Sequence, residues 1–234
     1  MDIPHKKHRS GSPILLGLIL LIVIAAIFAI STPHIHRCGN RATMTEAVNN
    51  AKQVFYLMIE FDGDYGEFPG DGTAVIHKDE NGEPYLDMRA YKGRYSNDYL
   101  RQFIVAGYTK SEEIFYVYGA SDKKPDNVIS SPGKILEAGE CGFAYVKNQS
   151  TSDNSGRPIL ISQMTGEGLT FDSDPYDGKA VVLRIDGAVK QLRINKAGEA
   201  VVQGTQTLFD TGPGTVWEGE EFDPSQVVFP EPAN

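Results

Sequence analysis

The chain has 234 residues and a formal net charge of −9, from 31 acidic and 22 basic side chains. Neutralising nucleic-acid phosphates requires clustered Lys and Arg, so this composition argues against a nucleic-acid partner. The length suits one domain of ordinary size with extensions at its ends.

The first predicted element is an apolar helix. Residues 14–30 are seventeen positions without a charged or strongly polar side chain. At about 1.5 Å of rise per residue such a helix is about 25 Å long, and with its neighbours it is long enough to cross a bilayer. We therefore predict a transmembrane helix over 14–32. A cleaved signal peptide is the alternative, because Lys6, Lys7 and Arg9 resemble its charged region.

The basic flanks of this helix predict its orientation. Lys6, Lys7 and Arg9 precede it, whereas Arg37 and Arg41 follow it. This bias favours an N-terminus in the cytoplasm and export of the remaining chain.

Both cysteines then lie on the exported side. A disulfide between Cys38 and Cys141 can persist there. Two independent buried thiols are the alternative.

A second helix is predicted from Thr43 to Phe61. Apolar side chains recur there at spacings of three and four, the period of an amphipathic helix. The pattern stops at residues 62–72, which are dense in turn-forming residues. Two polar surface loops (71–94 and 119–133) and a short helix (99–106), with an N-cap at Ser96-Asn97-Asp98, are predicted next.

Short strands are predicted after residue 140. Phe143–Val146 and Pro158–Ile161 are two of them, and residues 180–185 and 188–194 form a hairpin. Its central Asp186-Gly187 pair is typical of a two-residue type I′ turn. From Lys196 to the end, seven acids stand against one base, and beyond Val202 the prolines indicate a loosely attached acidic tail. The predicted fold class is therefore α+β, with a small antiparallel sheet.

The sequence offers little for catalysis. His77 is the one histidine within the folded part, and no Gly-x-Ser-x-Gly motif accompanies it. We expect no enzymatic activity and no cofactor other than calcium. Two acidic turns have the oxygen ligands that calcium prefers, one over residues 62–67 and one formed by Asp172, Asp174 and Asp177. Ordinary surface turns are the alternative.

Several segments together resemble a known family. They are the basic leader ending in Gly11, the apolar helix, Ala47-x-x-x-Ala51-Lys52-Gln53, Asp64-Tyr65-Gly66-x-Phe68-Pro69 and residues 182–189. This combination resembles bacterial type IV pilin-like proteins, and most of all the major pseudopilins of type II secretion. One position departs from the family: Leu16 stands where those proteins usually carry a glutamate.

The resemblance implies one long N-terminal helix packed by the sheet, and cleavage between Gly11 and Ser12. It also favours the turn with Asp172, Asp174 and Asp177 as the calcium site. The implied location is the bacterial inner membrane, as a single-pass protein with its C-terminal domain in the periplasm or outside the cell. The predicted division is a basic leader (1–13), a transmembrane helix (14–32), a juxtamembrane and amphipathic helix (33–61), an exported domain (62–202) and an acidic tail (203–234).

Two functions follow as hypotheses. The first is a structural or accessory subunit of a type II secretion or type IV pilus-like assembly, which takes part in protein transport. Its partners would be other pilin-like subunits, secretion-machinery proteins and membrane lipid. The second is a single-pass exported module that binds an extracellular ligand such as a glycan through the loops at 62–95 or 119–133.

Overall fold

The computed structural model describes residues 13–162, 164–166 and 168–233. The side chains of residues 13–19 and 25–39 lie outside the described part, and so do Gly11 and Ser12 of the predicted cleavage site. The chain divides into two compact units, Met1–Gly39 (unit 1) and Asn40–Asn234 (unit 2).

Helix α1 spans Pro13–Tyr65, and unit 2 contains it from Asn40 onward. In unit 2 its apolar side chains recur every three or four residues, so they form one buried stripe. The members of this stripe are at most 1% exposed: Ala47, Ala51, Val54, Met58 and Phe61. Residues 43–61 are helical as predicted, and the helix continues to Tyr65.

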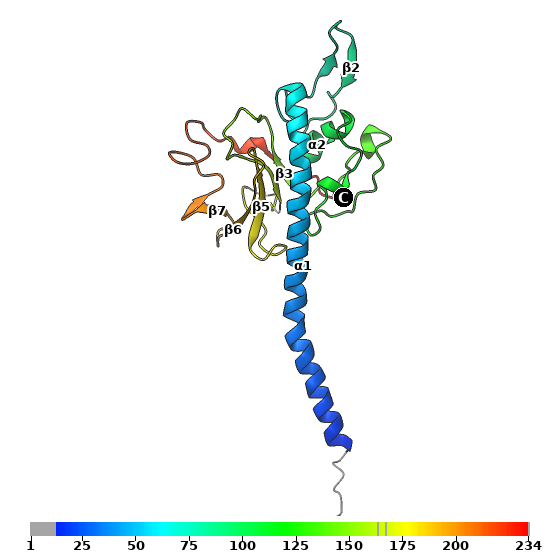
Figure 1. Cartoon of the computed structure of the whole chain (residues 1–234), viewed down its shortest axis with the longest axis vertical. Helices are drawn as coiled ribbons and strands as arrows, with labels where there is room; N and C mark the ends of the chain where they lie inside the picture. The colour runs from blue at the N-terminus through cyan, green and yellow to red at the C-terminus, as the bar shows by residue number, and fades with distance from the viewer. Residues whose placement is uncertain (1–12, 163, 167, 234) are drawn as a thin grey trace, which may run out of the picture. The chain divides into compact units, whose positions relative to one another are not determined.

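Unit 2 is built around a seven-stranded antiparallel sheet in the order β8-β7-β6-β5-β4-β3-β9 (Figure 1). Its strands are β3 (Phe143–Val146), β4 (Pro158–Ser162), β5 (Lys179–Arg184), β6 (Val189–Ile194), β7 (Ala200–Gln203), β8 (Gln206–Thr207) and β9 (Val227–Val228). The strands β1 (Ile76–Lys78) and β2 (Pro84–Asp87) form a separate hairpin. The other helices are α2 (Ser96–Val105) and the 3-10 turns η1 (Glu113–Phe115), η2 (Pro132–Lys134) and η3 (Pro224–Gln226).

The central strands β3, β4 and β5 are buried on both faces of the sheet. Val181 and Leu183 of β5 belong to the core that includes the buried stripe of α1 and residues of α2. Ala180 and Val182 point to the other face and belong to a second core with Trp217. Because both faces are covered, the central strands are apolar at successive positions instead of alternating with polar residues.

The predicted fold class is therefore wrong. The sheet is the dominant element of unit 2, not a small addition to a long N-terminal helix. Unit 2 contains α1 only from Asn40 onward. The physical reason is the C-terminal segment, which adds β8 and β9 and supplies the second core. The loosely attached tail expected over 203–234 is an integral part of the sheet.

The hairpin of β5 and β6 lies where the sequence predicts it, but its turn differs. Arg184 and Ala188 close it: the Arg184 N–H donates to the Ala188 carbonyl at 3.1 Å, and the Gly187 N–H donates to the Arg184 carbonyl at 2.9 Å. Of the two central residues only Gly187 has a positive φ, 76°. These bonds define a three-residue loop with a glycine bulge, in place of a type I′ turn.

The predicted membrane anchor is also corrected. Among the described residues, no helix is both long and apolar enough to cross a membrane. The apolar run over 14–30 lies at the short end of the roughly 17–25 residues that a spanning helix needs, so its length was a weak signal. This finding, together with the mostly β structure of unit 2, overturns the transmembrane, pseudopilin and secretion-system assignments and the inner-membrane and periplasmic location.

Candidate functional site

The predicted calcium turn lies between β4 and β5. Asp172, Asp174 and Asp177 are all exposed. The Asp174 N–H donates to Asp172 Oδ1 at 2.9 Å, and the Gly178 N–H donates to the Ser173 carbonyl at 2.8 Å. The turn is therefore closed by its own hydrogen bonds, and its binding of calcium stays a prediction.

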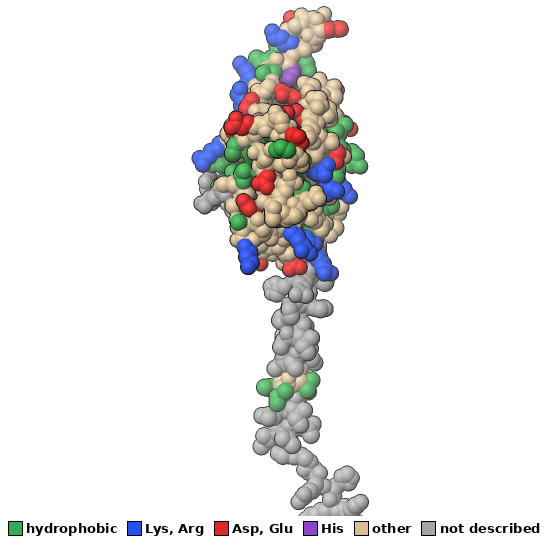
Figure 2. Space-filling view, turned by 90° about the vertical axis from the view of Figure 1, so that its left-hand side faces the viewer, with side chains coloured by type: hydrophobic (Ala, Val, Ile, Leu, Met, Phe, Trp, Pro, Cys, Tyr) green, Lys and Arg blue, Asp and Glu red, His purple; other side chains and the backbone are tan. Residues whose placement is uncertain are grey.

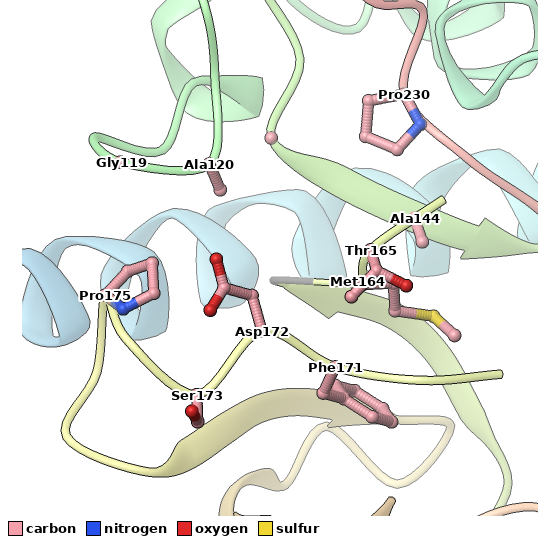
Figure 3. A pocket seen from close by; sticks show the side chains of 11 residues that line it. Gly119, Ala120, Ala144, Met164, Thr165, Phe171, Asp172, Ser173, Pro175 and Pro230 are labelled. Carbon is pink, nitrogen blue, oxygen red and sulfur yellow. The ribbon is translucent and has the colours of Figure 1, made fainter. Parts of the chain in front are cut away.

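Asp172 lines a cavity of about 500 Å³ (Figure 3). Its carboxylate points toward the loop that carries Gly119 and Ala120. The lining otherwise consists of hydroxyl, apolar and glycine residues, including Thr165, Ser173 and Phe171. One carboxylate without a second titratable partner in the lining does not make a general acid–base pair.

A second cavity, of about 370 Å³, lies over the part of the sheet formed by β5 to β8. Its lining combines apolar side chains such as Val182 and Leu192 with the charged side chains of Arg184, Lys190 and Asp210. Arg184 is held by Asp186, whose Oδ2 accepts a hydrogen bond from Arg184 Nη2 at 2.7 Å. This lining suits the binding of a small amphipathic ligand better than it suits catalysis.

His77 has a structural environment. Its Nε2 lies 2.9 Å from the Thr73 carbonyl oxygen. Its ring packs edge-on against Tyr65, with 4.5 Å between the ring centroids. The contacts of this imidazole are thus a backbone carbonyl and aromatic rings, not the hydroxyl or thiol of a nucleophile.

Cys141 is a free thiol that is 1% exposed. Its Sγ lies 3.7 Å from Ser96 Oγ and donates to the Phe143 carbonyl at 3.5 Å. Burial raises the pKa of this thiol to about 11. The side chain of Cys38 lies outside the described residues, so the predicted disulfide stays a prediction.

Within the described residues, the acidic side chains that do converge lie in the connection between α2 and β3. One oxygen from each of Asp126, Glu137 and Glu140 lies within 4.8 Å of the others. The sequence analysis did not single out this group, because its members lie eleven and three positions apart in an irregular segment. The length of that segment was the one feature of the sequence that pointed to a site there, since long irregular loops in compact domains are often functional.

The most exposed apolar stretch is in α1. Leu20, Leu21, Ile22, Val23 and Ile24 are between 48% and 69% exposed. Figure 2 shows hydrophobic side chains on more than one side of the described stretch of unit 1. Farther along α1, in unit 2, Tyr56 is 67% exposed and Ile59 39%. An uninterrupted exposed apolar stretch of this kind marks a contact surface.

Comparisons with protein-family models, with curated proteins and with solved structures found no match to this chain.

Proposed function

We propose that this chain is a non-catalytic structural or accessory subunit of an assembly of like chains. It acts by helix packing and surface contacts. The observation that carries the proposal is the exposed apolar stretch Leu20–Ile24 of α1.

The geometry of a helix decides what can cover this stretch. Successive residues are about 100° apart around the axis, so five in a row cover its whole circumference. A groove on one partner covers only one side of such a helix. A bundle of like helices covers every side, and this favours further copies of the same chain as the partners.

The energy of burial also favours several neighbours. Full burial of a large aliphatic side chain contributes about 1.5–3 kcal/mol relative to exposure. Because these five are only about half exposed, their further burial contributes on the order of 4–8 kcal/mol. Association itself costs about 4–15 kcal/mol. One pairwise contact is thus marginal, and an assembly with several contacts per chain is favoured.

The test compares the full-length chain with the double variant Leu21→Asn, Ile22→Asn by analytical ultracentrifugation. We expect the unmodified chain to sediment as multi-subunit particles and the variant to sediment mainly as monomer with an unchanged circular dichroism spectrum. Val202→Asn is the matched control, because Val202 is an apolar side chain of β7 that is 46% exposed. It should assemble like the unmodified chain.

A photo-crosslinking amino acid at position 21 identifies the occupant directly. Covalent dimers and higher multimers of the chain support the proposal. Crosslinks to detergent or lipid alone, or an unmodified chain that stays monomeric at all concentrations, contradict it.

A further inference from the structure

The connection between α2 and β3 buries two glutamates. Glu112 and Glu140 are both 0% exposed, although the segment that joins them contains only two 3-10 turns, Glu113–Phe115 and Pro132–Lys134, as helical structure. Their carboxylates hold consecutive backbone amides. The Leu136 N–H donates to Glu112 Oε1, and the Glu137 N–H donates to Glu140 Oε2 at 2.7 Å. The two buried carboxylates therefore lie beside each other at the same bend of the chain.

Glu112 has an unused oxygen. Its Oε2 is buried and has no hydrogen-bond partner. A buried carboxylate oxygen is normally hydrogen-bonded, paired with a cation or bound to a metal. Burial and then the negative charges of Glu140 and Asp126 raise the pKa of Glu112, although the Leu136 amide opposes them. Because Glu112 and Glu140 hold the amides of consecutive residues, this oxygen lies near the converging group of Asp126, Glu137 and Glu140.

The basic side chains nearby balance only half of this charge. Lys123 Nζ lies 2.5 Å from Glu137 Oε2 and 2.9 Å from Glu140 Oε1, and Lys134 Nζ lies 2.7 Å from Glu137 Oε1. Within the described part of the chain, no basic nitrogen lies within 4.0 Å of the carboxylate of Glu112 or Asp126. With all four carboxylates ionised, the two ammonium groups leave a charge of −2.

We propose that Glu112, Asp126, Glu137 and Glu140 bind a calcium ion, with the ammonium group of Lys123 as its built-in competitor. The donors are carboxylate oxygens without nitrogen or sulfur, which is the ligand set of a hard cation. Calcium fits better than magnesium because it takes 6–8 oxygens in flexible geometry, whereas magnesium requires a near-ideal octahedron. A calcium ion would supply the charge of +2 that the group lacks.

Lys123 explains how the site can also exist without metal. Its side chain is 42% exposed. The ammonium group can therefore leave the carboxylates for solvent when an ion arrives, and return when the ion leaves. Removing the amine should strengthen calcium binding, an outcome that a purely structural ion-pair network does not produce.

The site is tested by isothermal titration of the full-length chain with calcium chloride after treatment with a chelator. We expect an ion bound at these four carboxylates and a melting temperature that rises with calcium. Glu140→Gln and Glu112→Gln should each weaken binding roughly 10- to 100-fold, and Lys123→Met should strengthen it. Asp172→Asn is the control, because it alters the other acidic turn and should leave the affinity unchanged.

Three results would overturn the proposal. They are no heat of calcium binding in the unmodified chain, an affinity that Glu112→Gln leaves unchanged, or a loss of binding in Asp172→Asn. Lys123→Met keeps all four carboxylates, so it remains informative even where a glutamate variant fails to fold. An unchanged or weaker affinity in Lys123→Met would disprove the role of Lys123 as competitor.

Discussion

The buried carboxylate of Glu112 makes the stability of the metal-free protein depend on pH. Burial first, and then Glu140 and Asp126, raise its pKa above the usual 4.5. The folded chain therefore holds this proton more tightly than the unfolded chain. The contribution of Glu112 to stability is complete below pH 4.5 and is lost as the pH rises through its raised pKa.

Glu112→Gln replaces the titrating carboxyl group with an amide that does not titrate, and so tests this pH dependence. In chelator, the stability of the variant relative to the unmodified chain should increase as the pH is raised from acidic to neutral, measured by urea unfolding at each pH. Glu113→Gln, at an exposed neighbouring position, is the control. A stability difference between Glu112→Gln and the unmodified chain that does not change with pH would contradict the expectation.

Gly187 combines a positive φ with close contact to α1. Its φ is 76°, and a Cβ placed there would lie 2.6 Å from Cε1 of Phe55. Gly187→Ala should therefore lower the free energy of unfolding by about 2–4 kcal/mol, the sum of overpacking and left-handed strain. Gly204→Ala is the matched control, because Gly204 has φ 58° but open space around it. Urea unfolding that gives equal losses for both variants would exclude the contact with Phe55 as the cause.

The thiol of Cys141 should be unreactive in the folded protein. Burial raises its pKa to about 11, so very little thiolate forms near pH 8. In Cys38→Ser, which leaves Cys141 as the sole cysteine, a disulfide reagent should titrate no thiol in native buffer and one thiol in concentrated urea. Rapid labelling in native buffer would show that the core around Ser96 opens locally.

Of the two candidate calcium sites, only one could be predicted from the sequence. The closely spaced Asp172, Asp174 and Asp177 were visible as an acidic turn because local spacing alone indicates one. The proposed calcium site also draws on Glu112, which in the sequence fits the first turn of a helix that opens at Ser111. Its burial depends on an irregular connection folding back over it, and no local pattern encodes that path.

At the scale of secondary structure, the elements with a clear period were predicted well. The strands around Phe143–Val146 and Pro158–Ser162 and the β5–β6 hairpin lie where their apolar runs indicated. Helix α2 starts at Ser96, three residues before the predicted start, and its N-cap is Tyr95. The predicted capping residues lie inside the helix, where Asp98 accepts a hydrogen bond from the Tyr95 N–H at 3.0 Å. The strand β9 was missed because two valines between prolines carry no periodic signal. It exists through pairing with β3, far away in the sequence.

Trp217 is the centre of the second core. It is 2% exposed, its Nε1–H donates to the Leu208 carbonyl at 3.1 Å, and the Arg157 guanidinium lies 5.0 Å from its ring centroid. Trp217→Ala should lower the free energy of unfolding by about 3–5 kcal/mol. Unfolding is measured by circular dichroism, because the variant lacks the single tryptophan of the chain and its fluorescence. Val202→Ala, at a position 46% exposed, should change stability by less than about 0.5 kcal/mol. Similar losses for both would contradict a packed second core.

At the scale of the whole molecule, the division into two units predicts independent folding. Among the side chains that the structure describes, those of the core that includes α1 begin at Met44, so they all lie within unit 2. A fragment of residues 40–234 should therefore melt cooperatively at the same temperature as the full-length chain, by differential scanning calorimetry. It should also fail to form the proposed assembly. A fragment that is unfolded would show that unit 1 contributes to the stability of unit 2.

The pairing of β3 with β9 has a consequence for biosynthesis. The edge of β3 gains its neighbour only when Val227 and Val228, far later in the sequence, have emerged from the ribosome. Until then the nascent chain presents an open strand edge, which is a template for pairing with other chains. Protein production should thus be sensitive to translation that stalls or terminates before β9 is made.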